Sequence, residues 1–159
     1  MNVVAVGAPR AHTLLRLGRV SNLPTVWTNV VAGATMANAA ATIADVAVVG
    51  LAMTAFYVGG MYLNDFFDRE IDARERPGRP IHAGEIGAGT VSAIGFSLLA
   101  IGVAALTPFG LLPAICGLVL GAAIVLYDIW HKRNFFAPVI MGICRALVYL
   151  TTAAAISGE

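Results

Sequence analysis

Long uncharged segments alternate with short charged ones along this chain, and their spacing predicts membrane-spanning helices. There are 25 uncharged residues between Arg19 and Asp45, and 19 between Asp45 and Asp65. A further 42 lie between Glu85 and Asp128. That stretch is too long for one crossing, because a transmembrane helix takes about 20 apolar residues. A Thr-Pro-Phe-Gly run near its middle favours a turn and divides it into two spans.

The pattern predicts an all-α polytopic membrane bundle, with about five transmembrane helices in one domain covering residues 1–159. The expected spans are 24–44, 46–64, 88–107, 110–127 and 137–156. Basic residues precede the first span and follow the second and fourth, whereas the other connections carry at most one acidic residue. Because basic residues accumulate on the cytoplasmic side, the N-terminus and the charged loop after the second span are expected there. A cleaved signal peptide is disfavoured, because the first apolar stretch is too long.

Composition supports a membrane protein and excludes some partners. Hydrophobic residues make up 58% of the chain and charged residues 12%, against roughly 25% charged residues in soluble domains. The net charge is +1. The sequence has no basic stripe with interleaved aromatic residues, so it does not indicate a nucleic-acid partner. Cys116 and Cys144 lie in apolar segments and are interpreted as packing residues. The three histidines are scattered, without metal-ligand spacing.

Three carboxylates and an amide occupy one helical face where the second span ends. At about 100° per residue, Asn64, Asp65, Asp68 and Asp72 fall within an arc of roughly 100°. Like charges this close resist ionisation unless a cation lies among them. Oxygen ligands suit Mg²⁺, which takes one or two carboxylates together with substrate phosphates. The cluster therefore predicts a magnesium–phosphate site at the mouth of a membrane pocket. The alternative is a solvated helix end with ordinary salt bridges to nearby arginines.

Arginines supply candidate phosphate contacts. The proline-containing run 74–80 ends the helix, and its arginines can fold back over a phosphate or simply fix the membrane topology. Arg145 lies within the last apolar span, where an arginine is expected to face the bundle interior and a polar partner. That partner is either a bound anion or, within the protein, a helix carbonyl or Asp128.

These motifs resemble those of a known family. The run N-D-x-x-D-x-x-x-D at 64–72, followed by R-P-I at 79–81, is similar to the first aspartate-rich motif of the UbiA superfamily of intramembrane prenyltransferases, such as 4-hydroxybenzoate polyprenyltransferases. Three weaker matches follow in the family's order. Residues 19–25 are similar to the start of its first helix, and Tyr127 with Lys132-Arg133 resembles the loop after its fourth. The run G-x-x-R-x-L-x-Y at 142–149 resembles its fifth helix.

The resemblance implies a Mg²⁺-dependent transferase that moves a prenyl group from a prenyl diphosphate to a hydrophobic or aromatic acceptor in the membrane lipid. The family roles carry over by motif to a metal set, a wider diphosphate–metal pocket and a catalytic set. These are Asn64, Asp68 and Asp72 for the metal, Asn64, Asp65 and Arg79 for the pocket, and Asp68, Asp72, Lys132 and Arg145 for catalysis, with Lys132 and Arg145 as diphosphate contacts.

One departure from the family leaves the function open. The family pattern has about nine helices and a second aspartate-rich motif, and only its N-terminal half is matched here. The pocket is therefore expected to need a C-terminal half or a second copy, as a homo-oligomer, unless the chain no longer catalyses. The alternative function is a non-catalytic membrane protein that binds or transports a polyprenyl lipid at the same aspartate-rich site. A weaker alternative is a structural membrane subunit whose acidic loop docks a basic partner.

Overall fold

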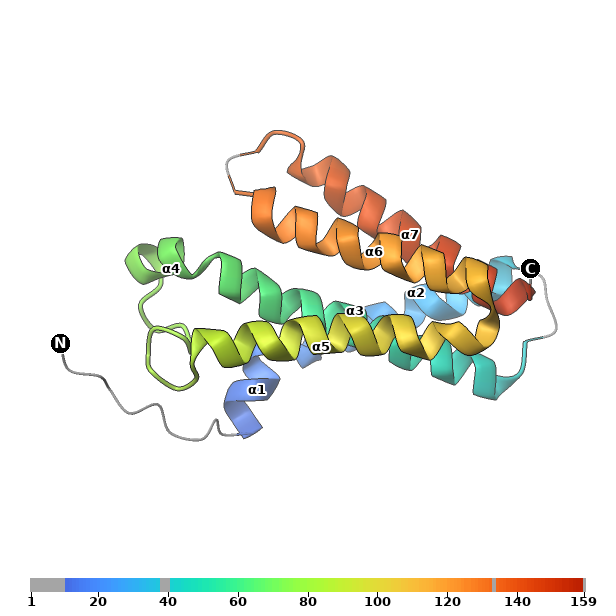
Figure 1. Ribbon diagram of the computed structural model, residues 1–159, viewed down its shortest axis with the longest axis horizontal. Coiled ribbons are helices and arrows are strands. Elements are labelled where there is room, and N and C mark those ends of the chain that lie inside the picture. The colour runs from blue at the N-terminus through green and yellow to red at the C-terminus, as the bar shows by residue number, and fades with distance from the viewer. Residues whose placement is uncertain (1–10, 38–40, 133, 159) are drawn as a thin grey trace.

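The computed structural model describes residues 11–37, 41–132 and 134–158 and confirms the all-α fold (Figure 1). No strand occurs within these ranges. The elements are, in order, α1 (Ala11–Leu17), the 3-10 helix η1 (Val20–Asn22), α2 (Leu23–Met36), α3 (Ile43–Phe67), α4 (Arg69–Glu75), α5 (Ala88–Leu106), the 3-10 helix η2 (Thr107–Phe109), α6 (Leu111–Trp130) and α7 (Ala137–Ser157).

Within the described residues, four helical segments are long and apolar enough to cross a membrane: α3, α5 with η2, α6 and α7. They correspond to four of the five spans predicted from the charge spacing. Large apolar side chains on their outer faces are exposed, as with Leu111 at 76% and Leu51 at 61%, and such surfaces are suited to lipid contact. The span predicted at 24–44 is represented by α2, whose 14 residues extend about 21 Å, less than a hydrocarbon core of about 30 Å.

A capping box sets the beginning of α3. The Thr42 hydroxyl oxygen accepts a hydrogen bond from the Asp45 backbone N–H at 3.1 Å, and the Asp45 carboxylate accepts one from the Thr42 N–H at 3.2 Å. This reciprocal pair satisfies two backbone donors that a helix start otherwise leaves free. Asp45 therefore lies in the first turn of α3, whereas the charge spacing identifies it only as a break between spans.

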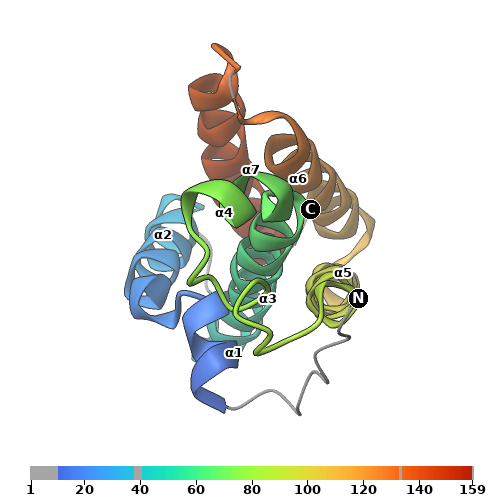
Figure 2. The same cartoon turned by 90° about the vertical axis from the view of Figure 1, so that its left-hand side faces the viewer.

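Helix α3 is the centre of the bundle (Figure 2). Its buried side chains, among them Met53, Phe56 and Leu63, form one core with apolar residues of the surrounding helices. Helices α2, α5, α6 and α7 all pack on α3. The charged segment at the end of α3 is consequently supported by several independent elements.

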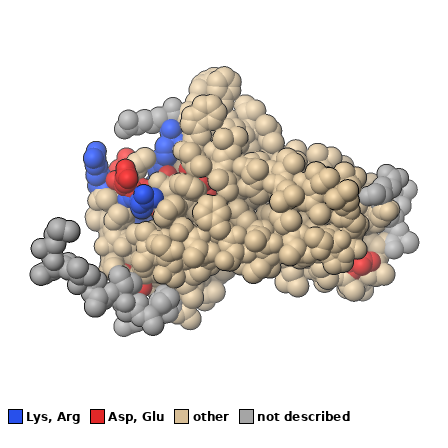
Figure 3. Space-filling view, in the orientation of Figure 1, with Lys and Arg blue, Asp and Glu red and all other residues tan. Residues whose placement is uncertain are grey.

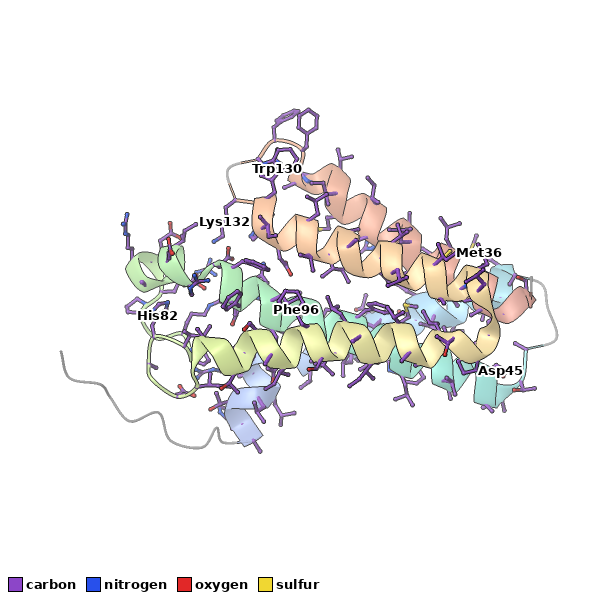
Figure 4. All side chains as sticks on the ribbon, in the orientation of Figure 1. Met36, Asp45, His82, Phe96, Trp130 and Lys132 are labelled. Atoms are coloured by element: carbon purple, nitrogen blue, oxygen red, sulfur yellow. The ribbon has the colours of Figure 1, made fainter. Side chains whose placement is uncertain are left out.

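Charged side chains gather at the end of the bundle that carries α4 (Figure 3). Lys132, after α6, lies at this end, whereas Asp45 lies at the opposite end (Figure 4). Long apolar helix surfaces separate the two ends (Figure 3). The charged side chains that could bind a polar ligand therefore lie mainly at one end of the apolar bundle.

Glycines permit the close approach of α3 and α5, which predicts a strong effect of Gly59→Ala. An added Cβ at Gly59 would lie 2.9 Å from the backbone oxygen of Gly95, and a backbone atom in a helix cannot easily move aside. We expect Gly59→Ala to lower the free energy of unfolding by about 1–3 kcal/mol, measured by denaturation in detergent. Gly142→Ala is the control, because a Cβ there meets nothing within 4 Å. Equal stability of the two variants would contradict this packing.

Candidate active site

Four polar side chains at the α3–α4 boundary are buried together. Asn64, Asp65, Asp68 and Asp72 are 9%, 5%, 6% and 2% exposed. Asp68 lies between the two helices but keeps a helical backbone, with φ −78° and ψ −5°. The N–H of Asp68 bonds to the carbonyl of Asn64, and the N–H of Asp72 to that of Asp68. The helical turn thus continues through the motif. The carboxylates are buried, so the boundary is not the solvated helix end considered as an alternative.

Two arginines hold one side of this carboxylate cluster. Arg79 forms an ion pair with Asp65, and its Nε lies 3.6 Å from Asp72 Oδ2. Arg19 Nη2 lies 3.3 Å from both Asp65 Oδ1 and Asn64 Oδ1. The predicted residue Arg79 is therefore beside the cluster. Arg19 joins it from the N-terminal segment, although the sequence analysis gave it no site role.

The other side of the cluster contacts the end of α6. Lys132 Nζ lies 3.3 Å from Asp68 Oδ2, and His131 Nε2 lies 3.5 Å from the same oxygen. Asp128 Oδ1 accepts a hydrogen bond of 3.3 Å from the Asn64 amide, and Asp128 is only 4% exposed. A fourth carboxylate thus joins the three of the motif. The structure brings Lys132 to the cluster as expected and adds Asp128 and His131.

The backbone at Arg19 is strained. Its φ of 44° and ψ of 45° lie in the left-handed region, which costs a non-glycine residue about 1–3 kcal/mol and persists only where the surroundings enforce it. The Tyr57 hydroxyl donates to the Arg19 carbonyl oxygen at 3.3 Å, and the Tyr62 hydroxyl donates to the Leu14 carbonyl oxygen at 2.9 Å. Two tyrosines of α3 therefore fix the segment that directs Arg19 to the cluster.

Glu85 anchors α1 from the other side. Its carboxylate accepts a 2.6 Å hydrogen bond from the Thr13 hydroxyl and forms a 2.9 Å ion pair with Arg16. The Thr13 hydrogen bond, helped by the nearby Arg16, holds the pKa of Glu85 below its usual range. The carboxylate is therefore charged at neutral pH, so α1 is tied to the loop between α4 and α5.

A cavity of about 390 Å³ lies between α2, α3, α6 and α7. Its walls are mainly apolar, and its polar groups include Asp128, Tyr127 and Arg145. The Tyr149 hydroxyl donates to Asn29 Oδ1 at 2.9 Å and links α7 to α2. A mainly apolar cavity with a few convergent polar groups is typical of a small-molecule site. Through Asp128 and Asn64, it meets the carboxylate cluster.

Arg145 lines this cavity from α7. It is exposed, and among residues 11–37, 41–132 and 134–158 it has neither an ion-pair nor a hydrogen-bond partner. The pairing with Asp128 or a helix carbonyl, considered from the sequence, does not occur there. An arginine in an apolar span without a protein partner is suited to an anionic ligand. Its role as a diphosphate contact stays a prediction.

The donor set fits Mg²⁺ in its chemistry. Within the described part of the chain, no three Asp, Glu, His or Cys side chains converge closely enough to hold a metal. However, Asp72 Oδ1 and Asp128 Oδ2 are buried without a hydrogen-bond partner, and leaving such acceptors unpaired is costly. Carboxylate and amide oxygens are the ligands that hard divalent cations prefer. Basic side chains pair with the three carboxylates of the motif, and a bound cation would satisfy the two unpaired oxygens.

The model of the UbiA prenyltransferase family matches residues 22–159. The chain belongs to this family. The resemblance to this family is therefore confirmed, and the match covers most of the chain. Membership in this family and the four apolar helices indicate an integral membrane protein.

Similar proteins of this family carry a common name. A digeranylgeranylglyceryl phosphate synthase of Ignicoccus hospitalis is 39% identical over 101 residues, covering 62% of this chain and 31% of that protein. One of Methanothermobacter thermautotrophicus is 38% identical over 77 residues, covering 47% and 26%. A solved structure from a study of digeranylgeranylglyceryl phosphate synthase in membranes superposes with a TM-score of 0.82 at 25% identity, over 91% of this chain and 52% of the other.

The chain therefore spans about a third or less of the curated relatives it matches and about half of the solved chain. The superposition covers nearly all of the bundle described here. What the two share is thus the helical arrangement that carries the first aspartate motif.

Proposed function

We propose that this UbiA-family chain carries the prenyl-donor site of an intramembrane prenyltransferase. In this reaction, Mg²⁺ supports transfer of a prenyl group from a prenyl diphosphate to an acceptor in the membrane. The observation that carries the proposal is the buried carboxylate cluster beside basic side chains at the mouth of an apolar cavity. A prenyl diphosphate has the same two parts, an anionic head and an apolar chain. The anionic head suits the charged end of the bundle, and the apolar prenyl chain suits the cavity.

The motif residues Asn64, Asp68 and Asp72 would hold Mg²⁺, with Asp65 beside them. When bound, the metal would neutralise the diphosphate and stabilise its departure as a Lewis acid. Lys132, which contacts Asp68, would donate hydrogen bonds to diphosphate oxygens, with His131 beside it. Such charge-assisted bonds strengthen as the leaving group takes the electron pair of the breaking C–O bond.

The cavity walls contribute by excluding water. Met53, Phe56 and Leu120 line the cavity and are almost completely buried. An allylic carbon that loses its diphosphate reacts with any nucleophile in reach, so dry walls favour the acceptor over water. The walls therefore protect the reactive carbon while the charged end holds the leaving group.

The relatives indicate the acceptor class. Both curated relatives are named as synthases of a glyceryl phosphate that carries two prenyl groups. We propose a hydroxyl-bearing glyceryl phosphate lipid as the acceptor of this chain, in place of the broader hydrophobic or aromatic class. Its hydroxyl oxygen would bond to the prenyl carbon as the carbon–oxygen bond to diphosphate breaks, and the hydroxyl proton would leave with the diphosphate, giving an ether.

The test is a transfer assay with purified protein in lipid nanodiscs. A labelled prenyl diphosphate is supplied with Mg²⁺ and a monoprenyl glyceryl phosphate. We expect equal amounts of prenylated ether and free diphosphate, and neither without the divalent cation. Mg²⁺-dependent binding of the donor without release of diphosphate would instead support the non-catalytic lipid-binding function.

Arg145→Leu is expected to weaken binding of a prenyl diphosphate analogue without impairing membrane insertion. Arg145 lines the cavity and its guanidinium has no partner in the described ranges, so the substitution leaves no buried acid unpaired. Loss of one hydrogen bond to a charged group corresponds to about tenfold or more in affinity. Arg74→Leu, at the exposed end of α4, is the control for a general loss of charge. Wild-type affinity in Arg145→Leu would show that Arg145 does not contact the diphosphate.

A further inference from the structure

A second basic pocket lies on the other side of α3 from Lys132 and His131. Its volume is about 370 Å³, and four arginines line it: Arg16, Arg19, Arg76 and Arg79. Asp65 is the acidic residue among its lining side chains. Figure 2 shows α1, which contributes Arg16, on one side of α3 and the pair α6 and α7 on the other. The pocket is therefore separate from the basic group that contacts Asp68.

The charges of this pocket are not balanced within the described residues. Arg19 and Arg79 share Asp65, with a further contact from Arg79 to Asp72, and Arg16 pairs with Glu85. Arg76 is exposed and has no acidic partner in the described part of the chain. Guanidinium groups present paired donors that match phosphate oxygens. Four of them around one small pocket suit a dianionic phosphate.

The strained backbone of Arg19 is an independent observation that supports a ligand here. A left-handed residue held by neighbouring side chains is a feature that clusters at ligand sites. This conformation directs Arg19 to Asn64 as well as Asp65, and Asn64 in turn donates to Asp128 at the cavity wall. Arg19 thus connects the arginine pocket to the apolar cavity.

We infer that the arginine pocket binds the phosphate monoester of the prenyl acceptor, while the donor diphosphate occupies the side of Asp68, His131 and Lys132. This inference rests on the proposed function. Asp65 and Asp68 are three residues apart on one helical face, and each already contacts a different group of basic side chains. The two anionic substrates therefore bind on opposite sides of the carboxylate row, with the acceptor head beside the donor head.

A phospholipid head group shares the phosphate chemistry of the acceptor. A phosphodiester carries one negative charge, whereas a phosphate monoester carries up to two at neutral pH. The number of arginines favours the monoester. The experiment must therefore separate the acceptor from a lipid that carries the same monoester, such as phosphatidic acid.

The test compares Arg76→Gln with Arg74→Gln. Both arginines are exposed and lie two residues apart, but only Arg76 lines the pocket. Binding to the full chain in nanodiscs is measured for three probes: geranylgeranylglyceryl phosphate, the same lipid without its phosphate, and geranylgeranyl thiolodiphosphate with Mg²⁺. We expect Arg76→Gln to weaken binding of the first probe about tenfold and to leave the affinities for the other two within twofold of the wild type. Arg74→Gln should leave all three within twofold.

The following results would overturn the inference. An equal loss for the thiolodiphosphate would place the pocket in the donor site, and an equal loss for the phosphate-free lipid would show a structural effect. Unchanged binding of the first probe, or none in the wild type, would exclude a phosphate site. Displacement of that probe by equimolar phosphatidic acid would show a general lipid head-group site. If only the thiolodiphosphate fails to bind, the proposed function fails and the arginine pocket stands.

Discussion

Replacing Asp68 with asparagine is expected to abolish Mg²⁺-dependent binding of a prenyl diphosphate and to reduce transfer by about a hundredfold or more. Asn keeps the shape of the side chain but removes the negative charge that a metal ligand needs. It also removes the charge that holds Lys132 and His131 at 3.3 and 3.5 Å. Binding of a thiolodiphosphate analogue, titrated with Mg²⁺, measures the first effect, and release of diphosphate measures the second.

The matched control for Asp68→Asn is Glu70→Gln. Glu70 lies two residues further along, its side chain is 86% exposed, and it contacts Arg69 at 3.8 Å. Glu70→Gln removes the same charge at a side chain that does not contact the cluster, so donor binding and prenyl transfer should stay within twofold of the wild type. Metal-dependent donor binding in Asp68→Asn at wild-type strength would exclude Asp68 as a metal ligand. The motif would then have a structural role in pairing with basic side chains.

Local patterns predicted the position of the helices and of the acidic face. Charges are costly within a bilayer, so the uncharged intervals that end at Asp65 and begin after Glu85 mark where helices can cross. Helical periodicity relates residues a few positions apart and predicts one face for Asn64, Asp65, Asp68 and Asp72, all of which are buried in the structure. Their chemical roles stay predictions.

Contacts between distant segments could not be predicted in this way. Arg19 meets Asp65 across 46 positions, and Asn64 meets Asp128 across 64. Nothing in the local sequence of Arg19 specifies its left-handed backbone. The scattered histidines show no ligand spacing, because spacing detects only ligands close in sequence, whereas Asp68, which His131 contacts, lies 63 positions away. One usable signal for Asp128 was present, since a carboxylate at the end of an apolar span is unusual.

The charge pattern also does not show where α2 ends. The uncharged interval continues to Asp45, but α2 ends at Met36. Thr42 and Asp45 form a capping box that begins the next helix. The Thr-x-x-Asp spacing resembles a capping box and could have been used to place this start. Hydropathy alone does not show where a helix ends within an uncharged interval.

Arg79→Gln is expected to lower the free energy of unfolding by about 3 kcal/mol, because it leaves buried carboxylates without their cation. Arg79 is the cation that contacts both Asp65 and Asp72, whose side chains are 6% and 3% exposed. Arg19 still reaches Asp65 at 3.3 Å, so Asp72 loses more. Denaturation in detergent without divalent ions measures the loss. Arg74→Gln should change stability by less than about 0.5 kcal/mol, as surface substitutions usually do.

Mg²⁺ should then restore part of the stability of Arg79→Gln. A cation that binds the folded state stabilises it by about 2.7 kcal/mol at a hundred times its dissociation constant. The variant has one positive charge fewer beside Asp65 and Asp72, so it should bind Mg²⁺ more tightly and gain more stability than the wild type. Adding Asp72→Asn to Arg79→Gln should recover stability without the metal and reduce the response to it. If Mg²⁺ raises the stability of neither protein, the carboxylates are held by the arginines alone, and the donor site uses basic side chains in place of a metal.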